Sequence, residues 1–172
     1  MSRDQAPDEE RIEGIEQLVA WFDSGSKGDA TLGVGTEHEK LGFDAATLRP
    51  LAYEGPRGIG ALLDALVERY GWEPGRDRNG AITALFRDGA VVTLEPGGQL
   101  ELSGRITQTI FETQSELNAH LREVADVGAA LGQRWTHLGL NPWDAPDAIP
   151  WMPKSRYQVM RDYLARRGTM GH

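Results

Sequence analysis

The chain has 172 residues, of which 18 are lysine or arginine and 26 are aspartate or glutamate, and its formal net charge is -8. That length and an apolar content of 40% favour one folded, soluble domain and exclude a chain that is disordered by composition. The acidic balance argues against a non-specific nucleic-acid binder and against a basic membrane-surface helix, because both need clustered lysine and arginine.

The N-terminal part of the sequence predicts a helix, a strand and a second helix. Apolar residues at helical spacing behind an acidic run predict an amphipathic helix over residues 7–23. A break that contains glycine and serine follows, and a strand is expected over residues 32–43. A second apolar stripe predicts a helix over residues 59–70, with Gly71 as its C-cap.

Three short strands are expected next, over residues 81–86, 90–94 and 99–102. Asp88 and Gly89 lie between the first two, and this dipeptide is a strong hairpin signal. We therefore expect these strands to be antiparallel.

The last part of the chain predicts a helix, a strand and a final helix. Thr109 and Glu112 have the spacing of a capping box ahead of a third apolar stripe. A strand over residues 135–140 and a helix over residues 155–167 complete the order. Hairpin-linked strands between helices favour an α+β fold, with a mainly antiparallel sheet packed with helices, over a doubly wound parallel sheet. No repeat or linker divides the chain, so residues 1–172 are expected to form a single domain.

The composition also bears on the cellular compartment. The sequence contains no cysteine, which excludes a disulfide framework, a thiolate zinc site and a cysteine nucleophile. The N-terminus is polar and acidic, unlike a secretory signal or an arginine-rich transit peptide. No apolar run approaches the length of a membrane span. We therefore expect a cytoplasmic protein without nucleic-acid or membrane partners.

The first chemically unusual stretch is residues 35–43. Glu37 and Glu39 share one face of the expected strand, because successive side chains of a strand point to opposite faces. Two neighbouring carboxylates repel each other and have low β-propensity, so local stability does not explain them. A bound cation would explain them, and a strand end that faces water is the alternative. His38 belongs to the opposite face and is more typical of a packed or solvated histidine than of a ligand.

The second stretch, residues 94–103, repeats the pattern. Gln99 and Glu101 alternate with leucines, so one face is apolar and the other presents an amide oxygen and a carboxylate. The segment 96–98, Pro-Gly-Gly, permits a bulge or turn that would bring Glu95 to the same polar side. A half-buried strand with a wet face is the plain alternative, and the repetition on two strands favours a site.

The donor types indicate which ligand such a face would take. Converging carboxylates without cysteine or a histidine cluster suit Mg²⁺ or Mn²⁺, which prefer oxygen ligands. Because Mg²⁺ enters such sites together with phosphate, an acidic face can bind ATP through the metal. The sequence has no Walker-type glycine-rich loop, which excludes a P-loop enzyme.

The third stretch, residues 152–157, opens the last helix. Lys154 and Arg156 stand at the positive end of that helix, where an anion is favoured and a basic side chain is not. An anionic ligand would remove the mismatch. Arg166 and Arg167, in contrast, are ordinary residues of a last helical turn.

The sequence resembles the plant and proteobacterial type of glutamate–cysteine ligase, one of the glutamine synthetase-like carboxylate-amine ligases. The resemblance rests on stretches in matching order and spacing, at residues 35–43, 94–103, 152–157 and 168–171. It covers nearly the whole chain but less than half of a typical family member. It implies that the chain is the N-terminal portion of a longer catalytic domain with a glutamine synthetase-like fold, and that it is inactive or nearly so by itself.

The resemblance implies ATP-dependent formation of γ-glutamylcysteine from glutamate and cysteine, the first step of glutathione synthesis, through a γ-glutamyl phosphate. The carboxylates that would hold Mg²⁺ are Glu37, Glu39, Glu95 and Glu101. Gln99 would lie beside them as a ligand or substrate contact. Lys154 and Arg156 would meet the phosphate or a substrate carboxylate, as catalytic and cofactor-binding groups. Thr169 is included among the cofactor-binding residues, near the amino-acid pocket.

Three other interpretations stay open from the sequence. One is a carboxylate-amine ligase that uses another amine, since nothing in the residues identifies cysteine as the substrate. A second is a noncatalytic domain that captures Mg-nucleotide or a divalent cation. The third is an α+β interaction domain whose glutamates are simply solvated.

Overall fold

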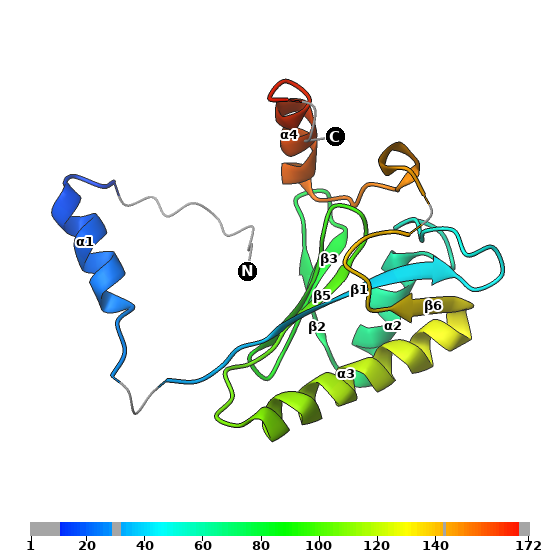
Figure 1. Ribbon diagram of the computed structural model, residues 1–172, viewed down its shortest axis with the longest axis horizontal. Coiled ribbons are helices and arrows are strands. Elements are labelled where there is room, and N and C mark those ends of the chain that lie inside the picture. Colours follow the sequence, from blue (N-terminus) through cyan, green and yellow to red (C-terminus); the bar gives the residue numbers. More distant parts are fainter. Residues whose placement is uncertain (1–10, 29–31, 143, 169–172) are drawn as a thin grey trace.

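An antiparallel sheet forms the centre of the protein, as the computed structural model shows (Figure 1). The structure describes residues 11–28, 32–142 and 144–168. The sheet has six strands in the order β2-β3-β4-β5-β1-β6, and every neighbouring pair is antiparallel. The strands are β1 (Glu37–Asp44), β2 (Glu73–Arg76), β3 (Ile82–Arg87), β4 (Ala90–Leu94), β5 (Leu100–Ser103) and β6 (Gln133–Thr136). The predicted α+β class is confirmed.

The described helices are α1 (Ile15–Ser24), α2 (Ile59–Tyr70), α3 (Ile110–Leu131) and α4 (Ser155–Leu164), with a short 3₁₀ turn at Pro146–Ala148. Helices α2 and α3 cover one face of the sheet (Figure 1). Leu62 and Leu66 of α2 and Val124 of α3 are buried against Leu94 and Leu102 of the sheet. We call this the covered face. The opposite face of β1, β4 and β5 carries the polar residues of the candidate site, and we call it the open face.

Local signals set several of the turns and helix ends. Asp88 and Gly89 both have positive φ values, 51° and 84°, as a two-residue hairpin between β3 and β4 requires. Thr109 Oγ1 accepts a hydrogen bond from the Glu112 N–H at 3.2 Å, and Glu112 Oε2 accepts one from the Thr109 N–H at 3.0 Å. Gly71 ends α2 in the left-handed conformation. These predictions are confirmed.

Other boundaries differ from the sequence-based expectation. The strand expected from residue 32 begins at Glu37, and Val34 forms only an isolated bridge with Thr107. The strand expected over 135–140 is instead β6, because the chain turns at the left-handed C-cap of α3 and pairs at once with the end of β1. The last helix ends at Leu164.

Strand β2 was missed. Its sequence, Glu73-Pro74-Gly75-Arg76, contains two residues that disfavour strands. It forms at the edge of the sheet, where a proline does not interrupt pairing on both sides, and its register shifts between Gly75 and Arg76.

Helix α1 forms where the apolar period predicted a helix, but it begins at Ile15. Residues 7–10 of the expected helix lie outside the described part. None of the residues of α1 is buried, and Trp21 and Phe22 are 70% and 71% exposed. In Figure 1 the helix stands apart from the sheet. Hydrophobic spacing thus predicted the helix but not where its apolar face packs.

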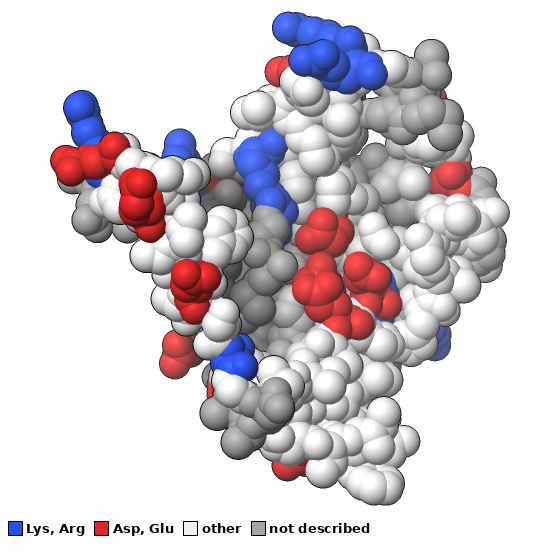
Figure 2. Space-filling view, turned by 60° about the vertical axis from the view of Figure 1, so that its left-hand side comes forward, with Lys and Arg blue, Asp and Glu red and all other residues white. Residues whose placement is uncertain are grey.

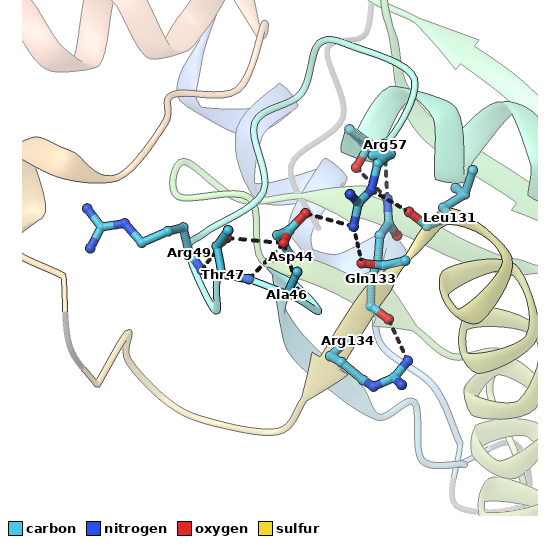
Figure 3. A network of polar contacts seen from close by, with 10 residues as sticks. Asp44, Ala46, Thr47, Arg49, Arg57, Leu131, Gln133 and Arg134 are labelled. Atoms are coloured by element: carbon cyan, nitrogen blue, oxygen red, sulfur yellow. Dashed lines mark hydrogen bonds and ion pairs between the residues drawn. The ribbon is translucent and has the colours of Figure 1, made fainter.

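A polar network holds the far end of β1, as Figure 3 shows. Asp44 accepts hydrogen bonds from the backbone N–H groups of Thr47 and Ala46, which hold the pKa of its carboxyl below the ordinary value. Arg57 pairs with Asp44 at 2.9 Å and donates to the Leu131 carbonyl at the end of α3. The network therefore ties β1, the segment before α2 and the end of α3 together.

None of the described helices combines the length and apolar character that crossing a membrane requires.

Candidate active site

Strands β1 and β5 bring carboxylates to the open face. Glu39 lies directly opposite Glu101, and Glu37 lies opposite Ser103, in the antiparallel register of these strands. Directly paired residues share a face, so all of these side chains lie on one side of the sheet. Glu37 and Glu39 are exposed, which the solvated alternative also predicts, but Glu101 is only 8% exposed. A solvated strand end does not explain why Glu101 is buried beside two other carboxylates.

Glu95 joins the same face through ordinary strand alternation. Thr93 pairs with Glu101, so Glu95, two residues further on, returns to the same side and faces Gln99. The Glu95 N–H donates to the Gln99 carbonyl at 2.9 Å, and the Gly98 N–H donates to the Glu95 carbonyl at 2.8 Å. Gly98 has a φ of 79°. The expected turn is therefore present, but a bulge is not what brings Glu95 round.

The start of α4 is held beside this face by contacts from distant segments. The phenol of Tyr157 donates to the Leu94 carbonyl at 2.6 Å, at the end of β4. Burial raises the pKa of Tyr157 to about 12, so the phenol stays protonated and remains a donor at neutral pH. The Met152 N–H donates to the Pro96 carbonyl at 3.3 Å. These contacts join the segment before α4 to the β4–β5 turn that carries Glu95.

Five charged groups converge where α4 meets the sheet. Burial raises the pKa of the Glu95 carboxyl above its ordinary value. The positive charges of Lys154 and Arg156 oppose that increase. The negative charges of Glu101 and Glu39 add to it. In the space-filling view, acidic atoms gather at the centre of one face and basic atoms lie above them (Figure 2).

The two basic residues have different environments. Lys154 is the N-cap residue of α4 and is 6% exposed, with its Nζ 5.4 Å from the centroid of the Tyr157 ring. The guanidinium of Arg156 lies 5.1 Å from the same ring, and its Nη2 donates to the Tyr157 hydroxyl at 3.4 Å. Within the described residues, the buried Nε of Arg156 has no hydrogen-bond partner. This donor is therefore still available to an anion.

Part of the anion expected at the start of α4 is supplied by the protein. The carboxylate of Asp77 accepts a hydrogen bond from the Ser155 N–H at 3.0 Å and another from the Ser155 hydroxyl at 3.1 Å. A carboxylate at this position satisfies a backbone donor of the first helical turn and complements the helix dipole. The N-terminus of α4 is therefore satisfied without a ligand, and only the basic side chains of Lys154 and Arg156 indicate an anion site.

Sequence reasoning missed two supporting residues, Asp77 and Ser103. The Ser103 hydroxyl donates to Glu101 Oε1 at 2.6 Å and orients that carboxylate. The signal for Ser103 was its position two residues after Glu101 on the same strand face. Asp77 gave no local signal, because it acts on a residue 78 positions further along the chain.

The remaining candidates are less well placed. Gln99 is half-buried at the start of the β5 pairing, on the acidic face. Glu37 shares the face but lies further along β1, and it is not among the charges that act on Glu95. Thr169 lies outside the described residues.

The donor chemistry of this face fits Mg²⁺ or Mn²⁺. The side chains that converge offer carboxylate oxygens, and a hard cation prefers such ligands. In the described ranges, no group of three or more acidic or histidine side chains is already arranged as a metal cage. An incomplete set of carboxylates still suits Mg²⁺, because this ion is commonly held by one or two carboxylates together with waters and substrate phosphates.

Comparison with known proteins gives a consistent result. The family model described as glutamate-cysteine ligase family 2 (GCS2) matches residues 33–172. Glutamate–cysteine ligase A, chloroplastic, of Oryza sativa subsp. japonica is 42% identical over 156 residues, which cover 91% of this chain and 31% of the relative. The chloroplastic glutamate–cysteine ligases of Nicotiana tabacum and Arabidopsis thaliana are 41% and 40% identical, and 29% of each is covered.

The chain therefore spans less than a third of the length of these curated relatives. The relatives are named as chloroplastic proteins, which contradicts the cytoplasmic localisation predicted from the polar N-terminus. The prediction was wrong because it inferred the compartment from the polar, acidic composition of the first residues, and that composition does not identify a compartment.

Proposed function

Because the chain belongs to glutamate-cysteine ligase family 2, we propose that it supplies the metal- and nucleotide-binding face of an ATP-dependent ligase that joins glutamate to cysteine. The observation that carries the proposal is the gathering of carboxylates on one face, where Glu39 lies directly opposite Glu101, with basic groups above them (Figure 2). The charges of Lys154 and Arg156 at the start of α4 act on the neighbouring Glu95. The family resemblance and the names of the relatives support the choice of substrates.

The reaction needs an activated carboxylate. A carboxylate is a poor electrophile, so the γ-carboxylate of glutamate would first take the γ-phosphoryl group of ATP and release ADP. The amine of cysteine would then attack the γ-carbonyl carbon, lose a proton and displace phosphate as the amide bond forms. Bound Mg²⁺ would neutralise the negative charge that moves among the phosphate oxygens during phosphoryl transfer. The protein would hold the reactants in line, with its carboxylates on one side of them and its basic side chains on the other.

The acidic side chains would hold the metal-bound phosphates. Glu39 and Glu101 are direct neighbours across two strands, so their carboxylates would present a pair of ligands on one face. The hydroxyl of Ser103 donates to one oxygen of Glu101, and the other oxygen would be the one that binds a cation. Glu95 adds a third carboxylate from the neighbouring strand end, and Glu37 extends the set along β1.

The basic side chains would meet the anions themselves. The charges of Lys154 and Arg156 act on Glu95, and these side chains would stabilise charge on the transferred phosphoryl group or bind a substrate carboxylate. Packing of the Arg156 guanidinium against the Tyr157 ring limits its rotation, so its buried Nε is held ready for an acceptor.

Titration calorimetry on the 172-residue chain tests the proposal. We expect saturable binding of Mg-ATP to the wild-type chain. Glu39→Gln should weaken it at least about 10-fold, because it removes one of the two directly opposed carboxylates. Glu68→Gln removes the same charge from an exposed position of α2 and should leave the affinity unchanged. Equal affinity in all three proteins, or no saturable heat from a folded wild-type chain, would overturn the proposal.

Turnover is a separate question from binding. That the 172 residues alone turn over little or not at all stays a prediction, based on the resemblance and on the share of the relatives that they cover. Phosphate release that depends on ATP, glutamate and cysteine would contradict it.

A further inference from the structure

A second cavity lies on the covered face, away from the acidic site. It has a volume of about 290 Å³ and opens between α3 and the strands β1 and β6. The α3 wall is apolar and includes Leu121 and Val124, and Trp135 of β6 adds an aromatic side chain. The polar lining comes mainly from the sheet side and includes Lys40, Arg134 and His137.

Lys40 is one of the polar residues that line this cavity. It is 1% exposed, and its Nζ donates to the His38 carbonyl at 2.9 Å and lies 3.2 Å from His38 Nδ1. No ion pair joins it to a carboxylate within the described ranges, where Glu39 and Glu101 act on it from the other face of the sheet. A buried ammonium with only neutral partners is energetically costly, and an anion inside the cavity would lower that cost.

The mouth of the cavity is also basic. Arg134 is exposed, donates to the carbonyl of Gln133 at 3.1 Å, and lies apart from the ion pair of Asp44 with Arg57 in Figure 3. The exposed ring of His137 lies 4.4 Å from that of His38, centroid to centroid. No acidic side chain belongs to the lining, as far as the structure describes the chain.

The other polar side chain of the lining is already satisfied. Gln133 Nε2 donates to the carbonyls of Arg57 and Gly58, both at 3.0 Å, and its Oε1 accepts from Trp135 Nε1 at 3.0 Å. Gln133 is therefore committed to structure and does not neutralise the cations. The cavity thus combines a fixed apolar wall with an unbalanced positive charge.

We propose that this cavity binds a small organic anion with a flat apolar body, such as an aromatic carboxylate or sulfonate. A cavity of about 150 Å³ is enough to hold benzene, so the volume here accommodates an aromatic ring together with a charged group. Inorganic phosphate would leave the apolar wall facing water, and a neutral hydrocarbon would leave Lys40 without a counter-charge. The site is separate from the ligase site proposed above and does not depend on it.

A pair of probes with opposite charge tests this inference. Naphthalenesulfonate and naphthylmethylammonium share the apolar body, and each is titrated into the 172-residue chain and followed by NMR. We expect saturable binding of the sulfonate, with shifts at α3 and β6, and binding of the ammonium compound at least about 10-fold weaker. Equal affinity for both probes, or no binding of the sulfonate, would overturn the proposal.

Variants locate the site. Lys40→Met keeps the length of the side chain and removes its charge, so sulfonate affinity should fall at least about 10-fold. Arg122→Gln removes a charge from an exposed position of α3 outside the lining and should leave the affinity unchanged. If Lys40→Met does not fold, Arg134→Gln and the cavity-filling Ala125→Trp decide, because both residues line the cavity and are exposed. Unchanged affinity in the folded variants would overturn the proposal.

Discussion

The two faces of the central sheet are made by the same strands but serve different purposes. On β5, Leu100 and Leu102 are 0% and 2% exposed on the covered face, while Glu101 between them points to the open face. Strand β1 repeats the division, with Lys40 on the covered face and Glu39 on the open one. The comparison shows that alternation puts buried apolar residues on one face and the carboxylates of the candidate site on the other. Substitutions on the two faces should therefore affect different measurements.

The largest effect on stability should come from the covered face. Leu66 of α2 is 0% exposed, and Leu66→Ala should lower the free energy of unfolding by about 2–5 kcal/mol, because it removes buried methyl groups and leaves a cavity. Urea denaturation measures this. Val159→Ala, at a residue of α4 that is 69% exposed, is the matched control and should change stability by less than about 0.5 kcal/mol. Equal losses in both variants would contradict the division of the faces.

A buried histidine makes the covered face sensitive to acid. His120 is 2% exposed, and burial lowers its pKa to about 3. Between this value and the ordinary one near 6.5, the unfolded chain binds more protons than the folded chain, so stability falls as pH is lowered. The contribution of His120 should amount to about 3 kcal/mol between pH 6.5 and pH 4.

His120→Leu should remove that contribution. We expect urea denaturation at the two pH values to show a smaller loss of stability for the variant than for the wild-type chain. Parallel losses in the two proteins would mean that His120 is not kept neutral by burial.

A smaller effect on stability is expected at the start of α4, where Asp77 holds the helix end. Asp77→Ala removes the acceptor at the start of α4 and should cost about 1 kcal/mol. Hydrogen exchange of the α4 amides should show the loss locally. Asp64→Ala, at an exposed position of α2, is the control and should leave α4 protection unchanged. Unchanged protection in Asp77→Ala would show that other contacts hold the helix start.

The smallest effect on stability should come from the open face. Glu37→Gln should leave the free energy of unfolding within about 0.5 kcal/mol of the wild-type value, or raise it slightly, because it relieves repulsion with Glu39. Urea denaturation in metal-free buffer measures this. A loss above about 1 kcal/mol would assign Glu37 a structural role.

Much of the candidate site could be predicted because its main signals are local. Glu37, Glu39, Gln99 and Glu101 obey the two-residue period of a strand, and that period alone places each pair on a common face. The hairpin at Asp88 and the capping box at Thr109 are local signals of the same kind, and both were read correctly.

What the sequence could not show depends on distant partners. Asp77 caps a helix that begins 78 residues later, and Tyr157 contacts a carbonyl 63 residues earlier. Strand β2 exists because β3 offers it an edge, against the propensities of Pro74 and Gly75. The buried state of Lys40 likewise depends on how α3 lies over the sheet.

The register of β1 has a consequence for how this protein can change. Glu37 and Glu39 occupy alternate positions with His38 and Lys40, so a slip of one residue against β5 would turn the carboxylates into the core and Lys40 into the acidic face. Substitution can retune either face gradually. Insertion or deletion of a single residue within β1 should therefore disturb both faces at once unless a β-bulge absorbs it.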